Sequence, residues 1–367
     1  MRKTVFWWNI PCAGMIGVLK AYADQIDSET IVITGQLSKS RKAMGWDDNG
    51  KLFKNHIILT DDEWIEKGKS LLDKYPDRLH VFNGITHPPR MQALIEYAIA
   101  SKILFANMSE AYFNLESGIR KILKGIFMHT LLPFRVKRIA RYSQAAICLS
   151  GGSKRDINQL KSFGFKRAYE FGYFTDIAAE EIKAHKSDGL VHILCPGLIE
   201  HYKGVDILIK ALANVKHSGI KNFKCHITGK GKQQKKVEGL ITKLVLTDYV
   251  IMEGVLDSKK YQDLLSKIDM LVAPGRVEPW GIRINEAIQR GNVVVVSDGL
   301  GANCLIEESR GGAVFKRGNS KDLANKLKPY LSCPDKLVEA KKANLSYRYQ
   351  ISSLFQAKRL YQIISDL

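Results

Sequence analysis

The sequence predicts an α/β protein made of two doubly wound parallel-sheet domains. Its 367 residues leave room for two domains of ordinary size. Short apolar runs alternate with helical patterns in both halves, as parallel strands joined by crossover helices require. The second series of strands starts afresh near Val191, after a charged stretch at residues 176–186 that is expected to be a linker helix. We therefore expect domains at 1–172 and 173–345, followed by a helical segment at 346–367.

The first half begins with a strand at residues 4–8, a loop that contains Gly14 and Gly17, and a helix from about Met15. The loop is either a tight turn or a place where a ligand meets the backbone. Further strands are expected at 31–34, 80–82, 103–106 and 145–149, the last of this half, with a helix at 90–101.

The second half repeats this alternation more clearly. Val293 to Val296 is a continuous β-branched run, which suits a strand buried on both faces. The expected strands are 191–195, 223–228, 250–253, 270–273 and 293–297, the expected helices 205–215 and 258–268, and helical periodicity returns at 347–366.

Two carboxylates, Glu278 and Glu286, follow the strand at 270–273. Pro279 suits a first helical turn, so the helix is expected to begin at Pro279 or Trp280, with Glu278 just before it. One ligand lying along the helix start could then meet both carboxylates. Gly281 would let that ligand approach the backbone, and a helix N-terminus favours phosphate. The alternative is a pair of surface glutamates spaced by chance.

The stretch from Glu278-Pro279-Trp280-Gly281 through Glu286-Ala287 to Gly291 and the valine run resembles the Glu-x7-Glu segment of family 4 retaining glycosyltransferases. The resemblance covers residues 191–330 with ordered motifs, whereas in the N-terminal half it is architectural only. It implies the GT-B fold, in which two Rossmann-like domains face a central cleft. It also implies that the C-terminal domain binds a nucleotide-sugar donor and that the last helix returns to the N-terminal domain.

The resemblance implies a role for each motif residue. Transfer of a sugar leaves negative charge on the departing phosphate, which preorganised cations and N–H groups stabilise. Lys203, just before Gly204, would bind that phosphate. Glu278 would contact the sugar near the reacting carbon, and Lys203 and Glu278 are the two catalytic candidates. Glu286 would accept bonds from the ribose hydroxyls. The other donor-binding residues implied are Gly197, Gly204, Gly229, Gly281, Ile282, Gly299, Gly301 and Ala302.

The sequence departs from the family pattern at two positions. Leu198 stands where an arginine commonly pairs with the lysine on the diphosphate, so Arg276 and Arg283 are candidate leaving-group cations in its place. Cys304 stands where many relatives have a glutamate, so that contact is expected to be absent.

Candidate acceptor-side residues come from the first half. Ser109 and Glu110 follow a strand end, and in GT-B enzymes the loop that here contains Gly14 and Gly17 contacts donor phosphate or acceptor. His129 is a further candidate for a cleft residue, although a lone histidine is more often structural.

Charge predicts an anionic partner. The formal net charge is +19, and residues 117–155 contain no acidic residue. In that segment cations alternate with apolar residues, as in segments that lie on an anionic bilayer without crossing it. The alternative is a solvated basic face over core packing. A nucleic-acid partner is not expected, because aromatic residues are few and no known nucleic-acid module is present.

Several classes of protein are disfavoured. The six cysteines are scattered without a Cys-x-x-Cys pair, which predicts reduced thiols in a cytoplasmic protein and neither a disulfide frame nor a zinc site. No apolar run is long enough for a transmembrane helix, and the uncharged run at 4–19 is interrupted by Asn9, Pro11 and Gly14, unlike a signal peptide. No Asp-x-Asp occurs, so we expect metal-independent transfer without a cofactor.

We therefore expect a metal-independent, hexosyltransferase-type retaining glycosyltransferase, cytoplasmic and peripheral on the inner face of the cell membrane. It would move a sugar, with UDP as the favoured nucleotide, to a lipid-linked or polysaccharide acceptor in the synthesis of O-antigen, capsule or exopolysaccharide. The alternatives are a sugar-nucleotide epimerase of the same fold and a non-catalytic binder of nucleotide sugars or polyanions.

Overall fold

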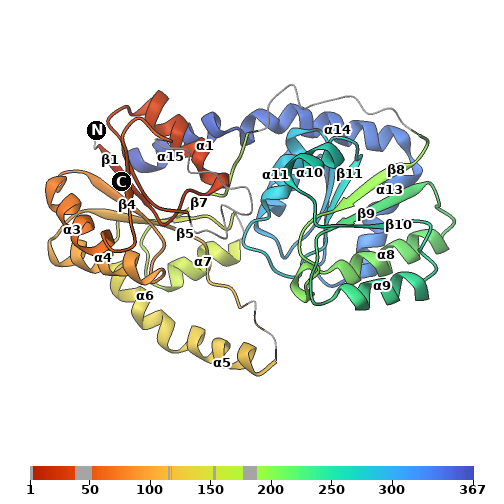
Figure 1. Cartoon of the computed structure of the whole chain (residues 1–367), viewed down its shortest axis with the longest axis horizontal. Coiled ribbons are helices and arrows are strands. Elements are labelled where there is room, and N and C mark those ends of the chain that lie inside the picture. Colours follow the sequence, from red (N-terminus) through yellow and green to blue (C-terminus); the bar gives the residue numbers. More distant parts are fainter. Residues whose placement is uncertain (1–2, 38–51, 115, 117, 152–153, 177–187) are drawn as a thin grey trace. The chain divides into compact units, whose positions relative to one another are not determined.

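The computed structural model describes residues 3–37, 52–114, 116, 118–151, 154–176 and 188–367. The chain forms two compact units, Met1–Thr175 with Ser352–Leu367 and Asp176–Ile351 (Figure 1). These boundaries fall a few residues after those expected from the sequence. The predicted linker helix at 176–186 lies outside the described residues, apart from Asp176.

The first unit contains a seven-stranded, fully parallel sheet in the order β3-β2-β1-β4-β5-β6-β7. Apolar runs correctly predicted its central strands, but the expectation that 145–149 is the last strand was wrong, and an edge strand after the second was missed. The strand expected at 103–106 lies two residues later. The strands are β1 (Thr4–Trp8), β2 (Ile31–Gly35), β3 (His56–Leu59), β4 (Leu79–Asn83), β5 (Phe105–Ser109), β6 (Ala146–Cys148) and β7 (Ala168–Glu170).

Helix α1 (Ala13–Ala21) begins earlier than expected, so Gly14 and Gly17 lie inside its first two turns and not in a loop. The C-terminal helix α15 (Ser353–Ser365) packs against α1 and the π-helix η1 (Tyr22–Ile26), with the Tyr22 and Tyr361 ring centroids 6.0 Å apart. The other helices of this unit are α3 (Trp64–Lys74), α4 (Pro89–Ala100), α5 (Gly118–His129), α6 (Leu131–Tyr142) and α7 (Lys154–Ser162).

The second unit contains a six-stranded parallel sheet in the order β10-β9-β8-β11-β12-β13. Its core includes Val293 and Val295, both fully buried, as the β-branched run predicted. The strands are β8 (Val191–Cys195), β9 (Phe223–Thr228), β10 (Val250–Gly254), β11 (Met270–Ala273), β12 (Val293–Ser297) and β13 (Gly312–Phe315).

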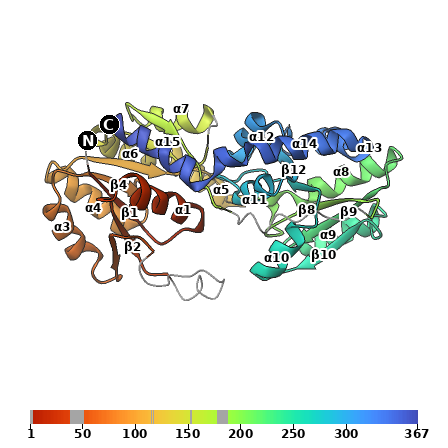
Figure 2. The ribbon, with the colours of Figure 1, turned by 90° about the horizontal axis from the view of Figure 1, so that it is seen from above.

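Helices cover both faces of this sheet, which is the doubly wound arrangement (Figure 2). Those that carry candidate site residues are α8, α10 and α11. The helices are η3 (His201–Lys203), α8 (Val205–His217), α9 (Gln234–Lys243), α10 (Ser258–Leu265), α11 (Ile282–Gln289), η4 (Gly301–Asn303), α12 (Cys304–Ser309), α13 (Ser320–Ser332), α14 (Pro334–Tyr347) and η5 (Arg348–Ile351).

Strand order places the ligand-binding edge of each sheet. Successive strands after β8 move outward in one direction, to β9 and β10, and the chain then returns to β11 on the other side of β8. The neighbouring strands β8 and β11 therefore mark a topological switch point, the place where open α/β sheets bind ligands beside the carboxyl ends of their strands. The first sheet has the same switch between β1 and β4. Within the described ranges, every helix is too short or too polar to cross a bilayer.

Candidate functional site

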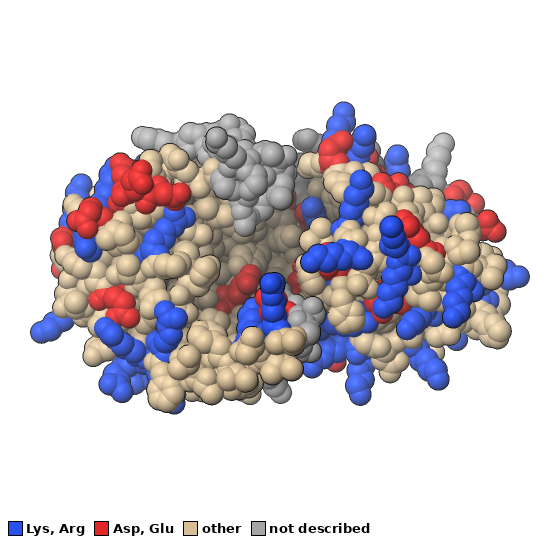
Figure 3. All heavy atoms as spheres, turned by 60° about the horizontal axis from the view of Figure 1, so that its bottom comes forward, with Lys and Arg blue, Asp and Glu red and all other residues tan. Residues whose placement is uncertain are grey.

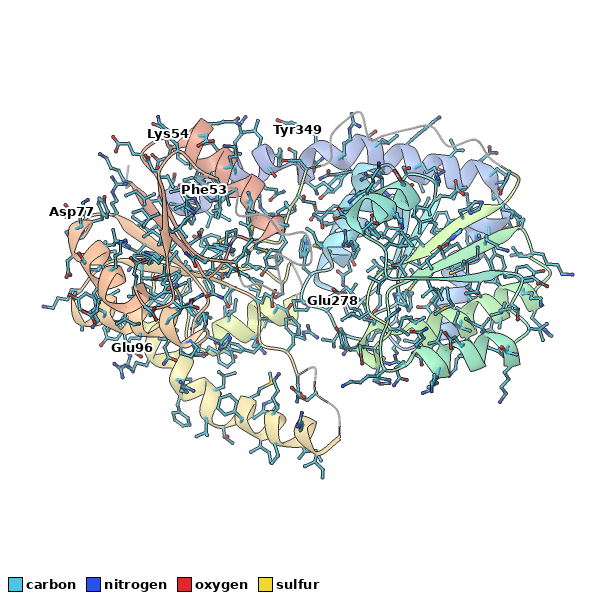
Figure 4. All side chains as sticks on the ribbon, viewed as in Figure 1. Phe53, Lys54, Asp77, Glu96, Glu278 and Tyr349 are labelled. Atoms are coloured by element: carbon cyan, nitrogen blue, oxygen red, sulfur yellow. The ribbon has the colours of Figure 1, made fainter. Side chains whose placement is uncertain are left out.

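Lys203 and Glu278 meet at the switch point of the second sheet. Lys203 ends η3 in the loop after β8, and Glu278 lies in the loop after β11 (Figure 4). The Lys203 Nζ donates to Glu278 Oε1 at 2.7 Å, and the two side chains are 19% and 26% exposed. The sequence placed both residues in the candidate site, and the structure brings their charged ends together across 75 positions of the chain.

Glycines bring the neighbouring loops into backbone contact. Gly204 has φ 70° and ψ 21°, and a Cβ added to it would lie 2.0 Å from the carbonyl oxygen of Pro274. At Gly229, φ is 92° and a Cβ would lie 2.1 Å from the carbonyl oxygen of Gly197. Only glycine allows this combination of positive φ and close approach. The loops after β8, β9 and β11 thus converge on one place.

Helix α11 begins at Ile282, so the expectation that it begins at Pro279 or Trp280 was wrong. Gly281, with φ 105° and ψ 64°, is left-handed and cannot continue a right-handed helix toward Pro279. The preceding residues instead run beside the loop after β12. Glu278 N donates to the Gly299 carbonyl at 3.2 Å, and its own carbonyl accepts from Gly301 N at 3.2 Å.

The loop after β12 contains the remaining predicted donor-binding residues. Ala302 N donates to the Trp280 carbonyl at 3.1 Å, and Gly299 N donates to Ser297 Oγ at 3.0 Å. Cys304 starts α12, and its Sγ donates to the Gly301 carbonyl at 3.4 Å. This loop therefore lies against the segment of Glu278, as a shared ligand would require.

Glu286 lies in the second turn of α11 and is 9% exposed. Its two carboxylate oxygens both accept from Arg283 Nη1 at 2.8 Å. The Arg283 guanidinium also lies 4.1 Å from the centroid of the Tyr261 ring, a cation–π contact with α10. Burial raises the pKa of Tyr261, and the Glu286 carboxylate raises it further.

Arg276 is the other candidate leaving-group cation, and it is also paired. Its Nη1 and Nη2 donate to Asp206 Oδ1 and Oδ2 at 2.9 and 2.8 Å, a bidentate pair with the first turn of α8. Its Nη1 also donates to the His201 carbonyl at 2.6 Å. Leu198, at the position where the family resemblance implies an arginine, is 53% exposed. That one of the two arginines replaces the missing one stays a prediction.

In the first unit, the segment 171–174 connects two of the predicted acceptor-side residues. Phe174 N donates to the Gly14 carbonyl at 2.6 Å, and Tyr173 Oη donates to Glu110 Oε1 at 2.9 Å. Burial raises the pKa of Tyr173 well above its ordinary value, and the Glu110 charge adds to this effect. Ser109 Oγ donates to the Glu110 carbonyl at 3.0 Å.

The other two acceptor-side candidates are Gly17 and His129. Gly17 lies inside α1, as Gly14 does, and His129 is exposed at the end of α5.

Sequence reasoning missed several residues that position the site. Asp206 could have been suspected, because an acidic residue in the first turn after Gly204 is favoured by the helix dipole. Tyr261 and Tyr173 gave no such signal, because their partners, Arg283 and Glu110, are far from them in the sequence. Among the described residues, no group of three or more His, Cys, Asp or Glu side chains could hold a metal ion.

Comparison with known families agrees with the geometry. Residues 177–346 match the family described as "Glycosyl transferases group 1". The matched residues make up a little under half of the chain and include all six strands of the second sheet. The chain is 24% identical over 209 residues to the alpha-D-kanosaminyltransferase of Streptomyces kanamyceticus, an alignment that spans 54% of this chain and 54% of that relative. The chain thus matches about half the length of that relative.

Solved structures match both units of the chain. An Anabaena protein in complex with UDP superimposes with a TM-score of 0.72 at 16% identity, and each chain is covered completely. A lipopolysaccharide outer core galactosyltransferase in its apo form gives 0.71 at 14% identity, again with complete coverage. These matches establish the fold, two Rossmann-like units of the GT-B type, over the whole chain.

Proposed function

We propose that this chain is a group 1 glycosyltransferase that moves a sugar from a UDP-sugar to a lipid-linked or polysaccharide acceptor, with retention of anomeric configuration, in the synthesis of a cell-surface polysaccharide. The observation that carries this proposal is the Lys203–Glu278 pair at the switch point of the second sheet. A cation for a departing phosphate and a carboxylate for sugar hydroxyls are the two charged groups that the transfer requires.

The geometry suits a donor that separates this pair. In the structure, the Lys203 ammonium and the Glu278 carboxylate satisfy each other. A diphosphate would take the Lys203 ammonium, and the hydroxyls of the sugar would take the Glu278 carboxylate. Gly204 and the N-terminus of α8 would add a close backbone and a helix dipole beside the phosphate.

The choice of UDP is supported by the solved relative that binds UDP, and the acceptor class by the relative that acts on the lipopolysaccharide outer core. We further propose that transfer needs no divalent metal, since Lys203 can supply the positive charge that a metal would otherwise bring. The epimerase and the non-catalytic binder remain the alternatives, the second because Leu198 removes a cation.

Turnover of UDP-sugars tests the proposal. The full chain would be incubated with radiolabelled UDP-glucose, UDP-galactose and UDP-N-acetylglucosamine and a membrane lipid extract, with EDTA present. Label that enters the lipid or polysaccharide fraction, reduced about 10²- to 10³-fold in Glu278→Gln, would support the transferase. Exposed Lys321 of α13 gives the matched control Lys321→Met, which should retain full transfer.

Two outcomes would contradict the transferase. Interconversion of the UDP-sugar without acceptor would identify an epimerase. Binding of the nucleotide without turnover in every extract would identify the non-catalytic binder.

We also propose that the arm formed by α5 and α6 rests on an anionic membrane. Figure 1 shows α5 projecting beyond the rest of the first unit. Its apolar side chains recur at spacings of three and four, which places them on one face of the helix. These apolar side chains of α5 are 37–76% exposed, and they are Ile119, Ile122, Leu123, Ile126 and Phe127. Leu131 and Phe134 of α6 are exposed to a similar degree.

Basic side chains accompany this apolar face. Figure 3 turns the lower edge of Figure 1 toward the viewer and shows blue basic side chains bordering a tan, uncharged surface. On α6, Arg138 pairs with Glu96 at 2.6 Å and Arg135 Nη2 donates to Gln92 at 3.1 Å, which fixes this helix to α4. An exposed apolar helix with cations beside it suits the headgroup region of an anionic bilayer. This placement supports a cytoplasmic enzyme on the inner face of the cell membrane.

Vesicle sedimentation tests the membrane proposal. The chain should sediment with phosphatidylglycerol vesicles and remain in solution with phosphatidylcholine vesicles, because the cations require anionic lipid. Ile122→Ser combined with Ile126→Ser should weaken binding about tenfold or more, by loss of buried apolar area. Val338→Ser, at an exposed apolar residue of α14, is the matched control. Equal binding by the arm variant and wild type would exclude the arm as the contact.

A further inference from the structure

Four side chains form a continuous line of hydrogen bonds across three neighbouring strands of the second sheet. Asp188 precedes β8, His192 lies on β8, His226 on β9 and Glu253 on β10. The His192 Nε2 lies 3.1 and 3.2 Å from the Asp188 carboxylate oxygens. The His192 Nδ1 lies 3.1 Å from His226 Nε2, and the His226 Nδ1 lies 2.7 Å from Glu253 Oε1.

Counting protons along this line gives its charge. An ionised carboxylate can only accept, so the outer nitrogen of each imidazole must carry a hydrogen. The contact between His192 and His226 needs a third hydrogen on one of the two inner nitrogens. Two neutral imidazoles carry only two hydrogens between them. All three bonds can therefore form only when the pair holds one proton more than two neutral histidines.

The geometry favours a proton between the rings over a metal ion. The ring centroids are 5.4 Å apart, much farther than the facing nitrogens at 3.1 Å, so the nitrogens point at each other along the line that joins the rings. A metal ion in that line would need two bonds of about 2.1 Å, and hence nitrogens about 4.2 Å apart. A proton fits the observed separation without movement of either ring.

The charged groups on the surrounding elements are compatible with one extra positive charge on this histidine pair. Asp269, just before β11, accepts from His192 N at 2.9 Å and pairs with Lys341 of α14 at 2.5 Å, so its charge is compensated. Lys224 of β9 donates to the Asp248 carbonyl at 2.6 Å. The two carboxylates at the ends of the line, Asp188 and Glu253, outweigh a single positive charge on the pair.

The line ends beside the candidate donor site. The pairing of β9 with β10 shifts between Met252 and Gly254, so Glu253 is the extra residue of a β-bulge. The next residue, Gly254, accepts through its carbonyl from Gly229 N at 2.5 Å. Gly229 is one of the predicted donor-binding residues. A bond from His226 to Glu253 therefore holds the bulge that meets the donor loop.

We propose that His192 and His226 share one excess proton, and that this proton holds the Glu253 bulge against the donor loop as a pH-sensitive switch. Loss of the proton at higher pH leaves two neutral imidazoles, which can complete only two of the three bonds. The bulge and the loop after β9 then loosen. The order of the second unit at this edge falls as pH rises, since the more protonated state is the fully bonded one.

Hydrogen exchange of the full chain tests the proposal, because the protection of the backbone amides at this edge of the sheet can be measured separately from that of the rest of the chain. After correction for intrinsic exchange, protection of residues 223–229 and 250–254 should fall roughly five- to tenfold between pH 6 and pH 8, the effect of one bond. His226→Asn keeps a donor toward Glu253 but has no proton to share, so protection should be the same at both pH values. Exposed His217, at the end of α8, provides the control His217→Asn, which should behave as wild type.

A second variant guards against misfolding of the first. His192→Gln keeps the contact with Asp188 and should also remove the pH dependence of protection. The double variant, His192→Gln with His226→Asn, should show no pH dependence either. Wild-type protection equal at pH 6 and pH 8, or a fall that persists in both variants, would overturn the proposal. So would a gain of protection on addition of Zn²⁺ that EDTA reverses, because the pair would then hold a metal ion.

Discussion

At the scale of single residues, the candidate site is defined by the ion pair between Lys203 and Glu278. Their pairing at 2.7 Å is only partly exposed, so each charge is preorganised yet reachable. Such a partly exposed pair adds little to stability, and its value is the arrangement of charge that it offers a donor. The arginine that the family resemblance implies beside this lysine is replaced by Leu198, which is exposed.

Leu198→Arg should restore the missing cation. The Leu198 side chain is 53% exposed, so an arginine fits there without disturbing the core, and a Cβ added to the neighbouring Gly197 would lie 3.8 Å from Lys203 Nζ. We expect UDP to bind about three- to tenfold more tightly, by one added charge-assisted bond. Titration calorimetry of wild type, Leu198→Arg and the neutral control Leu198→Gln measures this. Equal affinity in all three would show that the diphosphate lies elsewhere.

His80 gives a pH dependence to the first unit. Trp7 Nε1 donates to His80 Nδ1 at 2.9 Å, and His80 Nε2 donates to the Tyr75 carbonyl at 2.9 Å, so only the neutral ring satisfies both contacts. Burial lowers the pKa of His80 to about 4. The unfolded chain takes up this proton near pH 6.5, so stability is complete above that pH and is lost as pH falls toward 4, by about 3 kcal/mol.

Urea unfolding at pH 7 and pH 4.5 measures this loss. His80→Gln should show a smaller difference between the two pH values than wild type, because one buried titrating group is gone. His129→Gln, at an exposed histidine, should keep the full difference. An unchanged difference in His80→Gln would assign the acid sensitivity to other groups, among them His56, whose pKa burial also lowers.

At the scale of elements, the sequence predicted strands well where apolar runs were continuous. The runs of β1, β2, β8 and β12 are buried along their whole length or nearly so, which is why composition alone revealed them. The edge strands β3 and β7 are short and only partly buried, so no such run marked them. The start of α11 could not be read from Pro279, since Gly281 and the contact with the β12 loop decide it.

The candidate site, too, was predicted only in part. Motif spacing predicted which residues lie in the loops after β8, β11 and β12. It could not predict that Arg276 is paired with Asp206 or Arg283 with Glu286, because those pairs depend on side-chain direction across loops or helix turns.

Gly204→Ala tests how the loop elements depend on one glycine. The added Cβ would lie 2.0 Å from the Pro274 carbonyl, so the loops after β8 and β11 must separate. We expect a loss of about 2–4 kcal/mol in unfolding free energy and loss of UDP binding. Gly219→Ala, with φ 91° and no neighbour within 4 Å, is the matched control and should cost only about 1–2 kcal/mol. Equal effects would show that the close approach is unimportant.

At the scale of the whole molecule, the two units divide the work by their chemistry. The second unit carries the phosphate- and sugar-directed residues, and the first carries the Glu110–Tyr173 pair and the basic, apolar arm. The net charge of +19 fits a protein whose partners, a nucleotide diphosphate and an anionic lipid surface, are both negative. Binding of each should therefore weaken as salt is raised.

The most direct measurement of the central claim is a thermal-shift panel of the full chain with UDP, GDP, ADP, CMP and TDP, each with magnesium and with EDTA. A ligand that binds only the folded state raises the unfolding temperature, and the rise continues with the logarithm of the ligand concentration above the Kd. We predict a concentration-dependent rise with UDP that persists in EDTA and is lost in Glu286→Ala and Lys203→Met. No rise with any nucleotide, or an equal rise in both variants, would contradict a donor site built on Lys203, Glu278 and Glu286.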